Sequence, residues 1–265
     1  MLWVILSIAI ISLACGYLVY YIVNVGWVPT PQTLLETMLD MAKVTPSDYV
    51  IDLGSGDGRV VIAAAKRGAT ALGIEHNPDL VELARRAAAK AGVSARATFE
   101  KADIFENNFS KATVVILFLN SRINLKLRPK ILDMKPGTRI VSNNFAMADW
   151  QPDKTTHLGH FSVLPDAYMT SNEESRSIWR TAHLWTVPAT VGGTWKMDNG
   201  TISFTQEFQN ITGNLTMGTE DTELTGKLDG DKISFSAGGT EYTGKVSGNT
   251  ISGTCAEGGS WQLTR

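Results

Sequence analysis

The most informative stretch of this sequence is V-I-D-L-G-S-G-D-G-R, residues 50–59. An apolar run, followed by glycine at every second position and then by a helical pattern, favours a strand–turn–helix unit. The glycines Gly54, Gly56 and Gly58 permit a tight turn and let a ligand approach the backbone amides at the start of the helix. Asp52 precedes them, and its charge would repel a dinucleotide pyrophosphate but attract a ligand carrying an ammonium and a sulfonium.

Two more acids follow the next apolar runs. Glu75 closes the run G-I-E, about 20 residues after the loop, where nucleotide-binding folds hold a ribose diol. Asp103, in K-A-D-I, follows the third run and is placed to accept a hydrogen bond from an adenine amino group. Together with Asp52, these acids predict a nucleoside ligand with a positively charged amino-acid tail.

Apolar runs and helical patterns alternate along the first two thirds of the chain. Runs that are apolar on both faces and separated by helices predict a parallel sheet covered on both sides. A polar connection is expected from 149 to 177, before a last strand. We expect strands at 49–53, 71–74, 97–101, 113–119, 138–145 and 178–187, and helices at 34–42, 60–67, 78–91 and 125–132.

Residues 188–265 are expected to form a separate small β domain. Of the 24 glycines, 14 lie from Gly192 onward, and the turn sequences DNG, DGD, AGG and SGN separate short alternating runs. A partial repeat appears as ITGNL, LTGKL and YTGKV, starting at Ile211, Leu224 and Tyr242. This pattern predicts a small antiparallel barrel or sandwich, whose ligand or partner the sequence does not identify.

The N-terminal region is apolar and carries no charge before Glu36. Residues 2–25 are long enough to cross a hydrocarbon core of about 30 Å, so residues 1–25 are predicted to form a transmembrane helix. A cleaved signal peptide is less favoured because a basic n-region is missing, and lipoprotein cleavage at Cys15 is disfavoured by Ser12. Since the cations follow the apolar run, we expect a single-pass membrane protein whose larger part is cytoplasmic.

Composition excludes several classes of protein. The 265 residues are 43% hydrophobic and 19% charged with a net charge of -2, which argues against disorder and against a nucleic-acid partner. Two cysteines cannot build a disulfide framework or a cysteine-rich zinc site. The four histidines lack a ligand spacing, so no metal site is predicted.

On the motifs around Asp52, Glu75 and Asp103, residues 28–187 resemble the class I, seven-strand S-adenosylmethionine-dependent methyltransferases. The resemblance implies S-adenosyl-L-methionine as cofactor, with the glycine loop at its methionine end, Glu75 at the ribose, and Asp103 with Ile104 beside adenine. The implied cofactor-binding residues are Asp52, Gly54, Ser55, Gly56, Asp57, Gly58, Glu75, Asn77, Asp103 and Ile104.

The predicted fold class is therefore α/β. A Rossmann-like, doubly wound methyltransferase sheet in residues 26–187 is preceded by one transmembrane helix, residues 1–25, and followed by a small all-β barrel or sandwich, residues 188–265.

A narrower resemblance rests on VPTP at 28–31, DLGSGDGR, GIEHNP and the ending near Trp150. These are similar to the membrane-anchored protein-lysine methyltransferase family of mitochondria and bacteria, whose mitochondrial members modify the c subunit of ATP synthase and the adenine nucleotide carrier. The resemblance implies lysine N-methylation of a protein, including a membrane protein. The sequence departs from the pattern at Asp79, where those members carry Trp, and at 143–146, where N-N-F-A replaces Arg-Phe-Pro-Phe.

The acceptor side is less well defined. Phe118-Leu119-Asn120-Ser121 follows the fourth strand in place of an Asn-Pro-Pro-Tyr motif, which disfavours glutamine and base N-methylation. Asn120, Asn143 and Asn144 are candidates for catalytic contact, with turn or cap roles as the alternative. Other hypotheses are a small-molecule or lipid methyltransferase and a non-catalytic cofactor-binding scaffold. The acceptor, the degree of methylation and the oligomeric state do not follow from the sequence.

Overall fold

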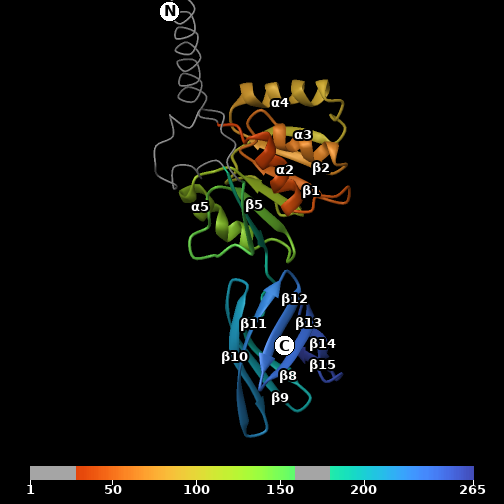
Figure 1. Ribbon diagram of the computed structural model, residues 1–265, viewed down its shortest axis with the longest axis vertical. Helices are drawn as coiled ribbons and strands as arrows, with labels where there is room; N and C mark the ends of the chain where they lie inside the picture. Colours follow the sequence, from red (N-terminus) through yellow and green to blue (C-terminus); the bar gives the residue numbers. More distant parts are fainter. Residues whose placement is uncertain (1–27, 159–179) are drawn as a thin grey trace, which may run out of the picture.

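The computed structural model describes residues 28–158 and 180–265 (Figure 1). Its first part is a mixed sheet covered by helices, and its second part is a β-barrel. The helices are α2 (Gln32–Met41), α3 (Arg59–Lys66), α4 (Pro78–Lys90) and α5 (Ser121–Leu132). The strands of the sheet are β1 (Tyr49–Leu53), β2 (Thr70–Glu75), β3 (Ala97–Lys101), β4 (Val114–Leu117), β5 (Arg139–Asn143), β6 (Lys154–His157) and β7 (Thr181–Thr186).

The sheet has seven strands in the order β3-β2-β1-β4-β5-β7-β6. The strands β1 to β5 are parallel to one another, whereas β7 runs antiparallel to both β5 and β6. The order reverses direction beside β1, so the carboxyl ends of β1 and β4 border the crevice where such sheets bind ligands. The strand β6 lies where the sequence predicted a polar connection. The prediction missed it because its residues, K-T-T-H, are mostly exposed and show no clear alternation of apolar and polar side chains.

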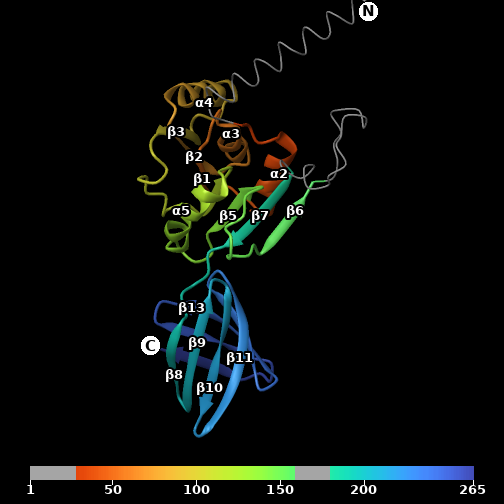
Figure 2. The same ribbon diagram turned by 90° about the vertical axis from the view of Figure 1, so that its left-hand side faces the viewer.

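Successive residues of the central strands point to opposite faces of the sheet. Val50 and Ile116 pack in one core with residues of α2, α3 and α4. Ile51 and Val115 pack in a second core with residues of α5. Both faces are thus buried, which is why these strands read as continuous apolar runs, and Figure 2 shows α5 across the sheet from α2.

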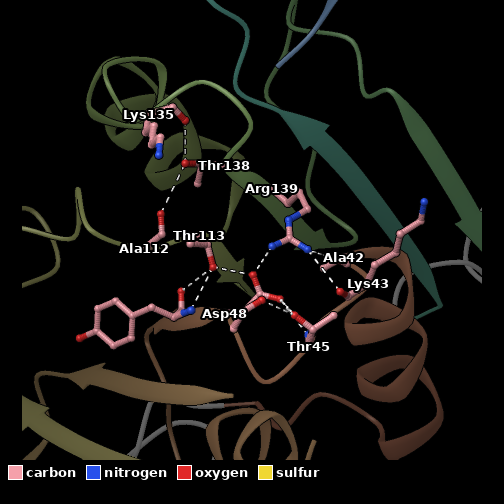
Figure 3. A network of polar contacts seen from close by, with 11 residues as sticks. Ala42, Lys43, Thr45, Asp48, Ala112, Thr113, Lys135, Thr138 and Arg139 are labelled. Atoms are coloured by element: carbon pink, nitrogen blue, oxygen red, sulfur yellow. Dashed lines mark hydrogen bonds and ion pairs between the residues drawn. The ribbon is translucent and has the colours of Figure 1, made fainter. Parts of the chain in front are cut away.

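A polar network joins the amino ends of three strands and the end of α2 (Figure 3). Asp48, which precedes β1, accepts hydrogen bonds from Thr113 Oγ1 at 2.7 Å and from the Thr45 amide at 2.8 Å, and it pairs with the Arg139 guanidinium. Arg139 also donates to the carbonyl oxygens of Ala42 and Lys43. Burial acts to raise the pKa of Asp48, but these hydrogen bonds and the Arg139 charge outweigh it and hold the pKa below its usual range.

The second part is a closed barrel in which every neighbouring pair of strands is antiparallel. Between barrel and sandwich, the two predicted alternatives, the structure forms the barrel. Its strands are β8 (Gly193–Met197), β9 (Gly200–Glu207), β10 (Asn210–Met217), β11 (Glu220–Asp229), β12 (Lys232–Ala237), β13 (Thr240–Ser247), β14 (Thr250–Cys255) and β15 (Ser260–Thr264).

The glycine of each repeated T-G pair lies where a side chain has no room. A Cβ on Gly226 would come within 2.5 Å of Phe235 Cβ, and one on Gly244 within 2.8 Å of the Trp261 ring. Phe235 and Trp261 meet edge to face, with ring centroids 5.6 Å apart. The repeat therefore provides the space in which large aromatic side chains fill the barrel.

The barrel packs against the amino edge of the sheet, opposite the ligand-binding edge (Figures 1 and 2). A Cβ on Gly230, in the β11–β12 turn, would come within 2.8 Å of Gly137 Cα, just before β5. Lys227 pairs with Asp153 at 3.4 Å. The linker after β7 is held by Gln206, whose side chain accepts a hydrogen bond from the Val191 amide at 2.7 Å.

The predicted fold class and localisation require correction. The longest described helix, α4, has 13 residues, about 20 Å at 1.5 Å per residue, which is too short for a hydrocarbon core of about 30 Å. Across 28–158 and 180–265, no helix is long and apolar enough to span a membrane. The segment 1–25, to which the predicted helix was assigned, lies outside the described residues. The fold class is accordingly a Rossmann-like sheet followed by a closed barrel, and neither the membrane-spanning helix nor the single-pass localisation is supported.

Candidate active site

A cavity of about 550 Å³ opens at the carboxyl edge of the sheet, beside β1 and β4. It holds most of the residues that the sequence predicted for cofactor binding. The predicted residues that line it are Asp52, Gly54, Ser55, Asp57, Glu75, Asp103 and Ile104, whereas Gly56, Gly58 and Asn77 lie behind this lining.

The glycine loop after β1 has the backbone geometry that its sequence requires. Gly54, Gly56 and Gly58 have φ values of 83°, 53° and 78°, in the left-handed region that other residues rarely adopt. Gly58 also precedes α3, and a Cβ there would come within 2.6 Å of the Phe99 ring. The loop can therefore turn sharply while α3 packs close to β3.

Asp52 is the most perturbed acid of the cavity. Its side chain is nearly inaccessible, with 4% of the residue exposed. Burial, together with the charges of Glu75 and Asp57, raises the pKa of Asp52 to about 8. Within the described part of the chain, no cationic side chain pairs with it. A bound cation would relieve this destabilisation of the ionised form.

Glu75 is buried and held in a fixed orientation at the end of β2. Its carboxylate accepts hydrogen bonds from the Gly56 amide at 3.1 Å and from the Asn77 amide at 3.0 Å, and the His76 ring lies 2.9 Å away. Asn77 caps α4 by accepting a hydrogen bond from the Asp79 amide. Gly56 and Asn77 thus position Glu75 rather than line the cavity themselves.

Asp103 and Ser55 complete the polar half of the cavity. Asp103 is exposed and accepts a hydrogen bond from the Phe105 amide at 2.8 Å. Ser55 Oγ is buried and has no hydrogen-bond partner in the structure. A buried hydroxyl without a partner is uncommon, and at a cavity wall it suits a polar ligand. The residues present therefore fit a ligand with an ammonium and several hydroxyl and amino groups.

Arg59 connects the glycine loop to residues 28–31, the segment that precedes α2 and contributes Val28 and Thr30 to the cavity wall. Arg59 binds the Asp57 carboxylate in a bidentate manner, with Nη2 at 2.7 Å and Nε at 3.0 Å, and its Nη1 donates to the Thr30 carbonyl oxygen at 3.1 Å. The Thr30 hydroxyl lies 3.5 Å from Asn143 Nδ2. The glycine loop is therefore connected to the segment 28–31 and, through Thr30, to the end of β5.

The other half of the cavity is apolar and was not predicted from the sequence. Phe118 follows β4 and Phe145 follows β5, and their rings are stacked with centroids 6.4 Å apart. Val28, Leu119 and Ile123 also line the cavity, and with the two rings they are called here its apolar half. The sequence offered one signal for an apolar cavity wall, the position of Phe118 directly after a buried strand. Single aromatic residues in such positions are also common in hydrophobic cores, so the signal is weak.

None of the three asparagines proposed as catalytic candidates lines the cavity. Asn120 caps α5 by accepting a hydrogen bond from the Ile123 amide at 3.0 Å. Asn143 is fully buried, and among the described residues its Oδ1 has no hydrogen-bond partner. Asn144 has a φ of 63°, and its amide donates to the Thr181 carbonyl oxygen. Among the described residues, no group of His, Cys, Asp and Glu is arranged to hold a metal ion.

Comparison with known proteins finds relatives that match part of the chain. Residues 52–154 match the family described as ANTKMT methyltransferase domain. A protein-lysine N-methyltransferase from Saccharolobus islandicus is 43% identical over 135 residues, which are 50% of this chain and 84% of that protein. The lysine N-methyltransferase of Mus musculus that is named for the c subunit of ATP synthase is 36% identical over 151 residues, which are 57% of this chain and 60% of that protein.

Among solved structures, an RNA methyltransferase from Salinibacter ruber in complex with S-adenosyl-L-homocysteine is similar to this chain. Its sequence identity is 41% and its TM-score is 0.53, covering 62% of this chain and 96% of that one. Because these matches cover between 50% and 62% of this chain, none of them extends over both the whole sheet and the whole barrel.

Proposed function

Because this chain belongs to the protein-lysine N-methyltransferase family and is an S-adenosylmethionine-dependent methyltransferase, we propose that its acceptor is a lysine side chain of a protein. S-adenosyl-L-methionine is the methyl donor. The domain limits that we propose are 26–187 for the methyltransferase part and 188–265 for the barrel part.

The polar half of the cavity is the proposed cofactor site. Asp52 is suited to the ammonium of the donor, since a cation would stabilise its ionised form. Glu75, held by two backbone amides, is suited to a ribose diol, and the exposed Asp103 beside Ile104 to the adenine end. Asp57 and Ser55 complete the set, while Gly56, Gly58 and Asn77 support it.

The stacked pair Phe118 and Phe145, in the same cavity as these acids, carries the proposal of a lysine acceptor. Aromatic faces attract ammonium groups, including methylated ones, and an apolar wall accommodates the aliphatic stem of lysine. Burial also lowers the pKa of an amine from its usual value of about 10.4, which favours the neutral form that can react.

When bound, the cofactor would supply an electrophilic methyl group, with its carbon–sulfur bond breaking as the carbon–nitrogen bond to the lysine forms and the amine proton passing to solvent. The residues of the chain hold the two reactants in line and exclude water, which is the main contribution a protein makes to such a displacement. The apolar half does this through Phe118, Phe145 and Leu119.

RNA is the second acceptor class that a specific observation favours, because the Salinibacter ruber protein is described as an RNA methyltransferase and is 41% identical. Aromatic rings also stack on bases. The mouse relatives are named for protein acceptors, the c subunit of ATP synthase and the adenine nucleotide translocase. Small molecules and lipids remain the other enzymatic alternatives.

The test is transfer of labelled methyl from S-adenosylmethionine into separated protein, RNA, lipid and small-molecule fractions of a cell extract. Hydrolysates are analysed for methylated lysine by mass spectrometry. We expect label as methyl-lysine in protein, greatly reduced by Phe145→Ala and unchanged by Met217→Ala, which alters an exposed side chain of the barrel. Label mainly in RNA, lipid or a small molecule would overturn the lysine assignment, and no label with intact cofactor binding would favour a scaffold.

A further inference from the structure

The β9–β10 turn of the barrel inserts two side chains against the methyltransferase part. Gln209 is buried, with 3% of the residue exposed. Its Oε1 accepts a hydrogen bond from Trp150 Nε1 at 2.9 Å, and its Nε2 donates to the Gln151 carbonyl oxygen at 2.8 Å. The Phe208 ring stacks on Trp150 with centroids 5.8 Å apart, and the Arg128 guanidinium lies 5.3 Å from the same ring.

The turn is also held firmly from the barrel side. The Gln209 carbonyl oxygen accepts a hydrogen bond from the Leu228 amide of β11 at 2.7 Å. Gln206 Nε2 donates to the carbonyl oxygens of Phe208 and Ala189, both at 2.8 Å. The position of the turn is thus set by the barrel and the linker together, and Trp150 is contacted by a rigid element.

Trp150 lies near the end of a segment that begins at the cavity. This segment, residues 144–151, is called here the crossing segment, because it returns from the carboxyl edge of the sheet toward its amino edge. Phe145 at its start lines the cavity. Trp150 and Met147 are fully buried, and the Trp150 amide donates to the Met147 carbonyl oxygen at 3.2 Å.

The crossing segment has backbone strain that its surroundings must hold in place. Asn144 and Ala148 have φ values of 63° and 55°, which are unfavourable for residues with a Cβ, although asparagine tolerates them better than alanine does. Such conformations persist where neighbouring contacts determine them. Near the barrel, these contacts are the Trp150 stacking and the Gln209 hydrogen bonds.

Helix α5 contacts the crossing segment at two places. Arg128 Nη1 donates to the Met147 carbonyl oxygen at 2.9 Å, and Asn124 Nδ2 donates to the Phe145 carbonyl oxygen at 3.0 Å. Ile123, which directly precedes Asn124 in the same helix, lines the cavity. Phe208 belongs to the same core as Ile123, so packed side chains extend from the barrel turn to the apolar half of the cavity.

From these contacts we propose that Phe208 and Gln209 of the barrel are positioning residues for methyl transfer. They hold the crossing segment so that Phe145 stays against Phe118 on the acceptor side of the cavity. The proposal rests on the proposed function only for the chemical identity of the acceptor. The glycine loop, Asp52 and Glu75 lie on other elements and are linked to the start of the crossing segment through the 3.5 Å contact of Thr30 with Asn143, so we expect the barrel turn to act on the acceptor side more than on the cofactor side.

The experiment uses the full chain with Phe208→Ala, Gln209→Ala and the conservative Phe208→Tyr, which keeps the ring. The matched control is Met217→Ala, which truncates an exposed apolar side chain beside the β10–β11 turn at the other end of the barrel. Three quantities are measured: affinity for S-adenosylhomocysteine by calorimetry, initial rates of labelled methyl transfer over a series of cell-extract concentrations, and hydrogen exchange of the amides in 144–151.

We expect Phe208→Ala and Gln209→Ala to lower methyl transfer by about tenfold, since small misplacements of a positioned group have effects of this size or larger. Exchange in the crossing segment should accelerate, cofactor-product affinity should change less than about twofold, and Phe208→Tyr should restore transfer. Transfer and exchange equal to those of Met217→Ala would overturn the proposal. An equally large loss of S-adenosylhomocysteine affinity would also overturn it, because it would show that the two residues stabilise the whole fold and not the acceptor side.

These outcomes are distinct from failure of the lysine assignment. If the wild-type chain labels RNA or lipid instead of protein, the same variants are compared in that fraction, and the positioning role is decided there.

Discussion

Two buried aspartates at opposite ends of β1 have opposite electrostatic environments. Asp48 precedes the strand at the amino edge, where Thr113, Thr45 and Arg139 lower its pKa despite burial. Asp52 lies within the strand at the carboxyl edge, where burial and neighbouring acids raise its pKa to about 8. Both are nearly inaccessible to solvent, with 6% and 4% of the residue exposed, but Asp52 is the more deeply buried of the two.

The difference separates a structural acid from a ligand-binding one. At the amino edge, each charge has its partner within the fold, and the network joins α2 to three strands (Figure 3). At the carboxyl edge, Asp52, Asp57 and Glu75 are gathered around one cavity. Strongly perturbed acids in a cleft mark functional sites, because the missing stabilisation is supplied by a ligand.

The largest effect is expected on breaking the amino-edge pair. Arg139→Ala leaves a buried carboxylate without its cation and should lower the free energy of unfolding by about 3 kcal/mol, measured by urea denaturation of the full chain at pH 7. The control Arg86→Ala removes an exposed pair with Glu82 on α4 and should cost less than about 0.5 kcal/mol. Equal losses in the two variants would show that the network contributes little.

The next effect concerns cofactor affinity. Asp52→Asn removes the ionisable group but keeps its shape, and S-adenosylhomocysteine binding should weaken by about 30-fold, the loss of one charge-assisted hydrogen bond worth about 2 kcal/mol. The free energy of unfolding at pH 7 should rise, because the folded wild-type chain must bind a proton that the unfolded chain has lost, and asparagine removes this cost.

Calorimetric titration measures this affinity, with Asp133→Asn, which alters an exposed acid after α5, as control. A variant that binds normally but unfolds easily would reverse the roles given to Asp48 and Asp52.

A smaller effect is expected with pH. With a pKa of about 8 in the free protein, Asp52 must lose a proton to pair with an ammonium, so affinity for S-adenosylhomocysteine should rise as pH rises and level off above pH 8. Proton linkage sets an increase of about fivefold from pH 7 to pH 8. Calorimetry in buffers of different ionisation enthalpy should detect the released proton. Asp52→Asn should bind independently of pH over this range, and a wild-type affinity that falls toward pH 8 would contradict the assignment.

The raised pKa of Asp52 also makes the stability of the fold depend on pH. The raised pKa of Asp52 means that the folded chain binds a proton that the unfolded chain has lost between about pH 4 and pH 8. Its contribution to stability is present below this window and declines as pH rises through it. For Asp48 the pKa is lowered, so its contribution is present above about pH 4 and is lost on acidification.

Much of the methyltransferase part followed from the sequence because the signals are local. The predicted helices at 60–67 and 78–91 agree with α3 and α4 within one residue. The helix predicted at 125–132 begins four residues earlier, since Asn120 caps it and the first turn is polar. The strand β6 and the apolar half of the cavity were missed, because short exposed strands and single aromatic residues carry weak patterns.

The sequence by itself determined the order of strands and helices, the glycine loop, and the meeting of Asp52, Glu75 and Asp103 at one edge. This followed because parallel strands joined by helices bring their carboxyl ends to the same side. Only the tertiary structure decided that Phe118 faces Phe145, and that Gln209 of the barrel binds Trp150 across 59 positions of sequence. Such pairings depend on barrel closure and on how two parts of the chain pack, and neither is encoded in a local pattern of residues.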